Sequence, residues 1–119
     1  MIFLSKLLVR NNVVVVVPVI SPFRAIRQLA RQELERFVEV WVNCSLDECV
    51  RRDPKGLYQQ ALRGEINNLT GLQDPYEEPD APEVVVDTEI LSVNECVSQI
   101  LEACVLPGYI GTEVMSADD

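Results

Sequence analysis

The side chains best suited to chemistry lie between Arg51 and Pro79, in the stretch RRDPKGLYQQALRGEINNLTGLQDPYEEP. It contains basic residues together with three glycines and three prolines, more turn-forming residues than a simple connection needs. Such a long excursion inside a small domain is typical of a lid or binding loop, or of a disordered connection. Within it, Lys55 supplies a point charge and Gly56 lets a ligand approach the backbone closely. The stretch is therefore the first candidate for an anion-binding site.

The charges of the chain are divided unevenly along its length. Residues 1–63 hold all ten Lys and Arg with six acidic residues, whereas residues 64–119 hold thirteen acids and no base. The net charge of -9 argues against nucleic acid as a general partner. Eight of the bases lie between Arg24 and Arg63, which suits a phosphate-bearing substrate. The alternative is that they line solvated helix faces and pair with acids of the second half.

Several chemistries are excluded by residues that the sequence lacks. None of the five glycines precedes a lysine, so the 119 residues contain no phosphate-cradling G-x-x-x-x-G-K-[ST] loop. The four cysteines show no C-x-x-C spacing and there is no histidine, so we expect free, buried thiols and no metal site. No stretch reaches the roughly 18 apolar residues of a membrane span, and no signal peptide is evident. We therefore expect a cytosolic protein that does not enter a membrane.

Hydrophobic spacing predicts the elements that position these residues. Ile2 to Val9 has the spacing of an amphipathic helix. Val13 to Ile20, VVVVVPVI, is apolar on both faces and is expected to form a buried parallel strand. Ser21 and Pro22 then suit the N-cap and first position of a helix that continues through Gln32.

The second half of the chain repeats the alternation of strands and helices. The expected strands are Arg36 to Val42 and Glu83 to Asp87. Two helices are expected to open with capping boxes, formed by Ser45 with Glu48 and by Ser92 with Glu95. The alternation predicts an α/β fold with about three parallel strands flanked by helices. Residues 108–119 are expected to form a flexible acidic tail.

Ligands of open parallel sheets bind beyond the carboxyl ends of the strands, where Ser21, the region near Asn43 and the 51–79 stretch are expected to meet. Ser21 is either a plain N-cap or an N-cap that also presents its hydroxyl to an anion. Arg24 and Arg27 lie one helical turn apart and could reach a phosphate or sulfate, or they could be ordinary surface charges.

Three strings resemble the adenylylsulfate kinase family: ISPFRAIR (20–27), FVEVWVNCSLDECVRRDPKGLYQQALRGEI (37–66) and TGLQDPYEEPDAPEVVVDT (70–88). The D-P-K-G-L-Y and T-G-x-x-D-P-Y-E-x-P motifs make the resemblance specific. Members of this family use Mg-ATP to phosphorylate the ribose 3′-hydroxyl of adenosine 5′-phosphosulfate (APS), which yields PAPS and ADP. The resemblance implies a P-loop kinase-type parallel sheet. It makes residues 1–107 part of the kinase domain and residues 51–79 its lid and substrate loop.

The resemblance also implies which residues face APS. Ile20 and Ser21 match positions that line the APS pocket, and Ser21 matches a serine that carries a phosphate in some members. Lys55, Gly56 and Leu57 match the part of the lid that lies near the phosphosulfate.

Further matches concern the nucleotide and the adenine of APS. Arg52 matches a lid residue near the nucleotide, and Thr70 and Gly71 match the turn beside the substrate adenine. Leu69 stands where the family usually has a phenylalanine that stacks on this adenine. Losing that ring could weaken base binding by about 1 to 3 kcal/mol, on the scale of other aromatic–base stacks.

The resemblance covers only the second part of the kinase, because the P-loop strand, the Walker lysine and the Mg-binding hydroxyl are not among the 119 residues. We therefore expect no kinase activity from this chain alone. We also expect Val13 to Val17 to present an unpaired apolar edge, so that the chain forms a homo-oligomer or pairs with a P-loop fragment. The alternatives are a non-catalytic kinase-like module that binds APS or PAPS, and a gene remnant without function.

Overall fold

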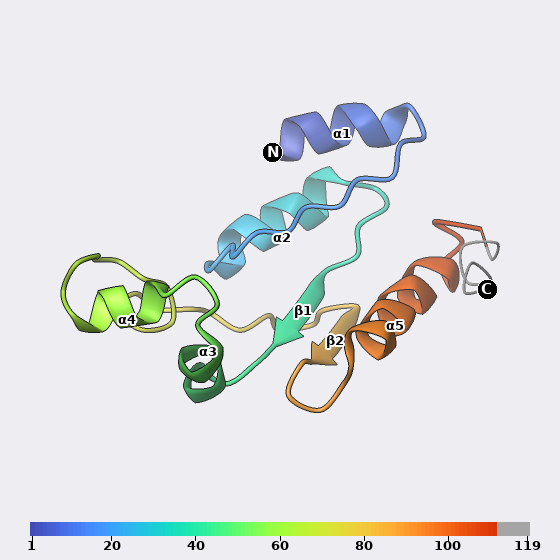
Figure 1. The fold of residues 1–119 in the computed structure, drawn as a ribbon. Helices are drawn as coiled ribbons and strands as arrows, with labels where there is room; N and C mark the ends of the chain where they lie inside the picture. The colour runs from blue at the N-terminus through green and yellow to red at the C-terminus, as the bar shows by residue number, and fades with distance from the viewer. Residues whose placement is uncertain (112–119) are drawn as a thin grey trace.

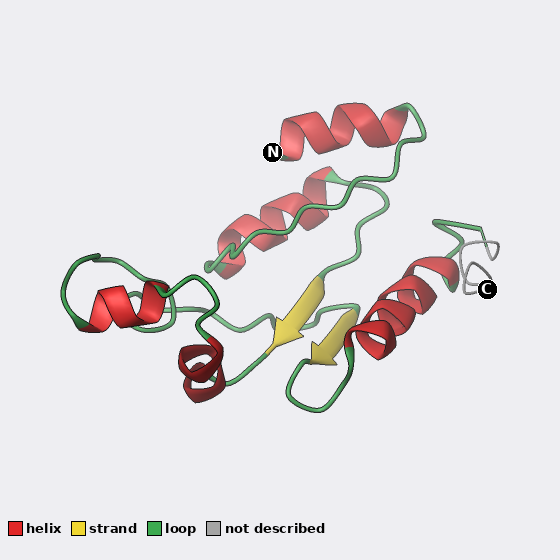
Figure 2. Cartoon of the chain, viewed as in Figure 1, coloured by secondary structure: helices red, strands yellow, loops and turns green. Residues whose placement is uncertain are grey.

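The computed structural model describes residues 1–111 as helices arranged around a small sheet (Figures 1 and 2). In chain order the elements are α1 (Ile2–Arg10), α2 (Arg24–Glu33), β1 (Val40–Asn43), α3 (Leu46–Arg52), α4 (Leu57–Leu62), β2 (Val84–Asp87) and α5 (Val93–Val105). The predicted α/β class is confirmed. Within the described residues no helix is long and apolar enough to cross a lipid bilayer.

The sheet consists of β1 and β2, which run parallel in a register that pairs Val40 with Val84 and Asn43 with Asp87. Because the strands are parallel, their carboxyl ends lie at the same edge of the sheet. The chain between the two strands carries α3 and α4. The parallel arrangement is as predicted, but the described residues form two strands instead of about three. The first of them is also shorter than the predicted 36–42 span, because only its last part finds a partner.

Two capping boxes were predicted, and one forms completely. The Ser92 hydroxyl accepts a hydrogen bond from the Glu95 amide at 3.3 Å, and the Glu95 carboxylate accepts one from the Ser92 amide at 2.7 Å. The Ser45 hydroxyl likewise accepts from the Glu48 amide at 3.3 Å. The Glu48 carboxylate, however, pairs with arginines of α3 instead of returning to Ser45, so half of the second box is missing.

The predicted N-cap at Ser21 is wrong, because α2 begins two residues later with Phe23 as its N-cap. Ser21 adopts a left-handed backbone conformation with φ of 40°. Its carbonyl accepts a hydrogen bond from Arg27 Nη1 at 2.5 Å, and the Pro22 carbonyl accepts one from the Glu77 amide at 2.8 Å. The turn before α2 is therefore tied both to Arg27 of the helix itself and to Glu77, more than 50 residues further along the chain.

The predicted strand at 13–20 is also wrong, because this segment is an extended loop that follows α1. Val14 is 71% exposed and Val16 is 83% exposed. Among the described residues, none of the backbone amides from 14 to 20 donates to another segment. A strand exists only when a neighbour completes its ladder, and β-branched composition cannot supply that neighbour.

The core is small and lies between β2 and α5. Val86 of β2 is 1% exposed, Cys96 of α5 is buried, and Ala61 of α4 is buried separately. The radius of gyration is 16.4 Å, against about 14 Å for a compact domain of this length. The described chain is thus more open than a closed domain.

The described chain ends beside the last turn of α5. The Tyr109 amide donates to the Cys104 carbonyl at 3.0 Å, which turns the backbone after the helix. Most of the tail predicted for residues 108–119 lies outside the described residues.

Candidate functional site

The carboxyl edge of the sheet is organised by Thr88, the residue that follows β2. Its amide and its Oγ1 hydroxyl both donate to the Asn43 carbonyl, at 3.0 and 3.2 Å. Arg52, at the end of α3, donates from Nη2 to the Thr88 carbonyl at 2.8 Å and from Nη1 to Oγ1 at 3.2 Å. The base of the predicted lid is therefore tied to the ends of both strands, where ligands of parallel sheets bind.

Carboxylates surround this edge and orient α3. Glu48 accepts hydrogen bonds from the side chains of Arg51 and Arg52, and these two arginines lower the pKa of Glu48 to about 2. Glu89 accepts from the Ser45 amide at 2.6 Å, and its bonds with Ser45 lower the pKa of the Glu89 carboxyl. The Arg52 guanidinium is therefore held on two sides, by Glu48 and by Thr88.

The turn between α3 and α4 carries three of the predicted substrate residues. Asp53 has φ of 22° and Gly56 has φ of 67°, and the Gly56 amide donates to the Asp53 carbonyl at 3.0 Å. Lys55 and Leu57 are exposed, and Gly56 is half-buried. A side chain at Gly56 would meet no atom within 4 Å, so the glycine is required by backbone conformation and not by space. The turn therefore presents Lys55 to solvent.

Asp53 is a structural residue of this turn that the sequence analysis missed. Its carboxylate accepts hydrogen bonds from the amides of Tyr58 at 3.1 Å and Gln59 at 3.0 Å, so it caps α4 in place of Gly56. Asp53 lies four residues before α4, outside the usual N-cap position, but an aspartate in an Asp-Pro-x-Gly turn often accepts hydrogen bonds from nearby backbone amides and could have suggested this role. Thr88, in contrast, has no local signal, because its partners lie 36 and 45 residues away.

The predicted adenine turn forms a compact loop of its own. The Leu69 carbonyl accepts hydrogen bonds from the amides of Gln73 at 2.8 Å and Asp74 at 3.2 Å, and Gly71 donates to the Asp74 carbonyl at 2.8 Å. Gly71 has φ of 88°, and a Cβ there would lie 4.0 Å from Leu46 of α3. The turn around Leu69, Thr70 and Gly71 thus lies against the start of α3.

The predicted site residues do not all contact one another in the structure. Ile20 is 64% exposed and Ser21 is half-buried, both at the end of the extended 13–20 segment. In the part of the chain that the structure describes, no hydrogen bond connects Ser21 with the turn at Lys55 to Leu57. The described hydrogen bonds therefore do not link the residues predicted to line the APS pocket with the predicted lid.

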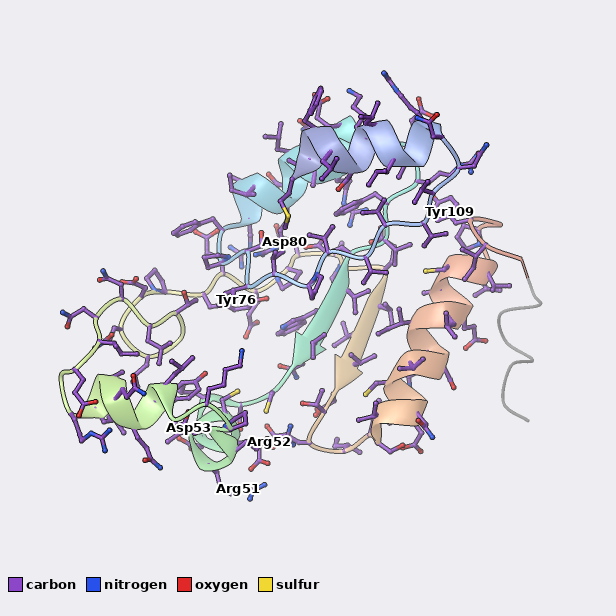
Figure 3. All side chains as sticks on the ribbon, turned by 45° about the horizontal axis from the view of Figure 1, so that its top comes forward. Arg51, Arg52, Asp53, Tyr76, Asp80 and Tyr109 are labelled. Atoms are coloured by element: carbon purple, nitrogen blue, oxygen red, sulfur yellow. The ribbon has the colours of Figure 1, made fainter. Side chains whose placement is uncertain are left out.

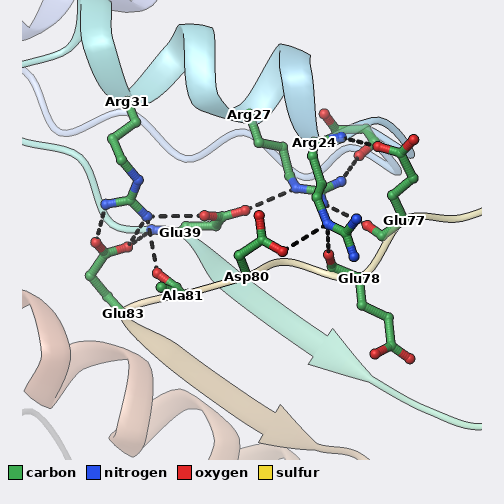
Figure 4. Close-up of polar contacts among 10 residues, drawn as sticks. Arg24, Arg27, Arg31, Glu39, Glu77, Glu78, Asp80, Ala81 and Glu83 are labelled. Carbon is green, nitrogen blue, oxygen red and sulfur yellow. Dashed lines mark hydrogen bonds and ion pairs between the residues drawn. The ribbon is translucent and has the colours of Figure 1, made fainter.

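The arginines of α2 make an extensive set of contacts, which Figure 4 shows. Arg27 is 10% exposed and donates from Nε to Glu39 at 2.9 Å and from Nη2 to the Glu77 carbonyl at 2.5 Å. Arg31 pairs with Glu39 at 3.0 Å and also with Glu83, and these pairs raise the pKa of Arg31 despite partial burial. Together with the Arg24–Asp80 pair at 3.0 Å, these contacts form what we call the arginine network.

A hollow of about 170 Å³ lies beside the arginine network, lined by Arg24, Arg27, Gln28, Arg31, Glu39, Pro79, Asp80 and Ala81. Ligand pockets usually measure about 300 Å³ or more, so this hollow is too small for a nucleotide. Its arginines are also occupied by carboxylates and carbonyls. The network therefore holds the 77–83 segment against α2 and β1.

Comparisons with known proteins agree on the relationship. The family model described as adenylylsulphate kinase matches residues 1–87. The adenylyl-sulfate kinase of Picosynechococcus is 48% identical over 108 residues, which cover 91% of this chain and 61% of the relative. A probable adenylyl-sulfate kinase of Archaeoglobus fulgidus is 56% identical over 86 residues, which cover 72% and 56%.

The chain belongs to the adenylylsulfate kinase family. Its structure also resembles that of the Mycobacterium tuberculosis APS kinase solved in complex with AMPPNP and APS, with a TM-score of 0.80 and 35% identity. That match covers 86% of this chain and 61% of the mycobacterial enzyme. The chain therefore spans about three-fifths of the length of the relatives it matches. The P-loop kinase-type fold implied by the sequence resemblance is thereby confirmed.

Proposed function

We propose that this chain contributes the lid and the APS-facing elements of an adenylylsulfate kinase, which transfers a phosphoryl group from ATP to the 3′-hydroxyl of APS. Family membership supports this reaction, and the mycobacterial relative has been solved with an ATP analogue and APS bound. We place the reaction in the cytosol.

The observation that carries the proposal is the anchoring of Arg52 to Thr88 at the common end of β1 and β2. Because Arg52 begins the turn that leads into α4, this anchor fixes one end of the lid where ligands of parallel sheets bind. A planar guanidinium suits a phosphate oxygen pair, so Arg52 is the proposed nucleotide contact.

The remaining roles follow from the chemistry of the exposed turns. Lys55 supplies a mobile positive charge for the phosphosulfate, and Gly56 and Leu57 shape the backbone around it. Leu69, with Thr70 and Gly71, would give the adenine an apolar contact. Ile20 and Ser21 would close the other side of the APS site, and Ser21 is the residue that could carry a phosphate.

We propose that the residues of this chain do not suffice to hold Mg-ATP. Among residues 1–111, no three cysteine, aspartate or glutamate side chains gather into a metal-binding group, and the 119 residues contain no phosphate-cradling glycine loop. Phosphoryl transfer depends on such groups to position the phosphates and neutralise their charge. We therefore propose that the 119-residue polypeptide alone has no kinase activity and that a P-loop polypeptide must supply them.

The exposed apolar surface supports the need for a partner. Val14, Val16 and Ile20 are each more than half exposed, although their sequence favours a buried strand. A contiguous apolar surface of this kind favours association. We propose that this segment pairs either with a P-loop fragment or with a second copy of the chain.

The binding part of the proposal is tested by the melting temperature of the 119-residue chain with and without APS, since a ligand of the native state stabilises it. Lys55→Ala should weaken APS binding about tenfold or more, the effect of losing a charge-assisted hydrogen bond. Lys6→Ala is the matched control, because Lys6 is the other lysine of the sequence. Lys6 lies on α1 and forms an ion pair with Glu33 of α2, away from the turn that carries Lys55. An equal effect of Lys6→Ala would contradict the assigned role of Lys55.

The catalytic part is tested by measuring PAPS formation from APS and Mg-ATP. The purified chain should give no turnover, and adding a polypeptide with the P-loop half of a relative should restore it. Turnover by the chain alone would refute the proposed dependence on a partner. APS binding without turnover in the mixture would instead favour a non-catalytic kinase-like module.

A further inference from the structure

Cys44 and Cys49 occupy positions that bring their side chains together at the start of α3. Ser45 is the N-cap, so Cys44 directly precedes the cap and Cys49 is the fourth residue of the helix. Side chains at these two positions normally pack against one another as a hydrophobic staple. The Cys49 amide donates to the Ser45 carbonyl at 3.0 Å, the bond that closes this turn. Both thiols are free and half-buried.

The surroundings of Cys49 agree with this placement. Burial raises the pKa of the Cys49 thiol, the adjacent Cys44 thiol raises it further, and the Tyr58 hydroxyl lowers it. Burial also raises the pKa of Tyr58, and Cys49 adds to that increase. The neighbours that act on the Cys49 thiol are thus Cys44, which precedes the N-cap of α3, and Tyr58 of α4.

We propose that Cys44 and Cys49 form an oxidation site, at which a peroxide converts the two thiols into an intramolecular disulfide. One thiolate attacks a peroxide oxygen and becomes a sulfenic acid, and the cleaved peroxide leaves as water or an alcohol. The second thiolate then attacks the sulfenic sulfur, the sulfur–sulfur bond forms, and hydroxide leaves and is protonated to water. The two electrons lost by the thiol pair are those gained by the peroxide.

The bridge has a consequence for the turn at residues 53–56. The bridge would consume the Cys49 thiol that interacts with Tyr58 of α4, and so remove one interaction between α3 and α4. Cleavage by trypsin after Lys55 should therefore be faster in the oxidised chain. Both effects are properties of the α3–α4 region and do not depend on the proposed kinase reaction.

The other two cysteines provide a matched internal control. Cys96 and Cys104 lie on the same face of α5 and are separated by eight residues. At the rise of an α-helix their Cα atoms are about 12 Å apart, whereas a disulfide needs less than about 7 Å. They cannot bridge without unwinding the helix.

The experiment treats the whole 119-residue protein with increasing hydrogen peroxide, alkylates the remaining thiols, and analyses the tryptic peptides by mass spectrometry. Cys44 and Cys49 fall in one peptide, residues 37–51. The expected product is this peptide with two hydrogens fewer and no alkyl group, restored by dithiothreitol. It should form equally in a Cys96→Ser/Cys104→Ser variant.

Single variants separate the bridge from simple oxidation. Cys44→Ser and Cys49→Ser should each lose the bridged peptide and accumulate an oxidised single thiol instead. The proposal is overturned if both thiols of the wild-type peptide remain alkylated at peroxide concentrations that oxidise Cys96 or Cys104. It is equally overturned if they give only sulfinic acids or intermolecular disulfides.

Discussion

The arginine network and the apolar segment 13–20 lie next to each other in the chain. They differ in whether their residues find interaction partners among the described residues. In the network, Arg27 finds a carboxylate and two carbonyls among the described residues, and it becomes almost buried. In the segment, Val16 is apolar and β-branched, which favours a buried strand, but it remains 83% exposed. A long polar side chain can reach partners on several loops, whereas a strand needs a whole neighbouring strand. The network is therefore complete in this chain and the segment is not.

The largest effect is expected from breaking the network at Arg27. Arg27→Ala leaves the Glu39 carboxylate, which is 12% exposed, without its nearest cation and frees the carbonyls of Ser21 and Glu77. Because Glu39 keeps its pair with Arg31, the free energy of unfolding should fall by about 2 to 3 kcal/mol, less than for a fully uncompensated buried charge. Urea denaturation measures this loss.

Arg51 is the matched control, because its side chain is 72% exposed and, among the described residues, it pairs only with Glu48 of its own helix. Arg51→Ala should change the free energy of unfolding by less than about 1 kcal/mol. Equal losses for the two variants would show that the arginine network does not stabilise the fold.

A second prediction compares the same substitution at a buried and an exposed valine. Val86→Ala should cost about 2 kcal/mol, because the site is 1% exposed between β2 and α5. Val16→Ala should change stability by less than about 0.5 kcal/mol. The two variants are compared by urea denaturation at a low protein concentration. A cost at Val16 as large as that at Val86 would mean that the segment is buried in solution.

A third prediction concerns the acid sensitivity of the network. Burial raises the pKa of Glu83, but its bonds with Arg31 and the Glu39 amide outweigh this and leave the pKa lowered. Because the folded pKa lies below the unfolded one, the stabilisation is present above about pH 4.5 and is lost as pH falls through the folded pKa. This half-exposed pair should contribute less than about 1 kcal/mol.

The measurement compares urea denaturation of wild type and Glu83→Gln at pH 7 and pH 3. The difference between the two proteins should shrink at the lower pH. A difference that stays constant across this range would contradict the role of the Glu83 carboxylate.

The smallest effect on stability, but a visible one on association, is expected from a Val14→Lys/Val16→Lys variant. Lysines at exposed strand-forming positions prevent edge-to-edge pairing. Sedimentation at high concentration should show self-association of the wild type and a shift toward monomer in the variant. A monomeric wild type would contradict pairing with a second copy and leave the P-loop fragment as the proposed partner.

The sequence by itself was sufficient for elements that depend on neighbours within a few residues. The Ser92–Glu95 capping box and the limits of α5 follow from hydrogen bonds between residues three or four apart. The strings around Asp53 to Tyr58 and Thr70 to Pro79 were enough to identify the family, which the comparisons confirmed.

The tertiary structure decided the features that depend on distant partners. It placed Arg52 against Thr88, moved the start of α2 from Ser21 to Phe23, and left residues 13–20 without a ladder. The first two outcomes depend on residues tens of positions away, Thr88 for Arg52 and Glu77 for the turn before α2, and the third on the lack of a neighbouring strand among the described residues. Local propensity gives these segments a tendency, and only the contacts formed on folding determine which tendency is realised.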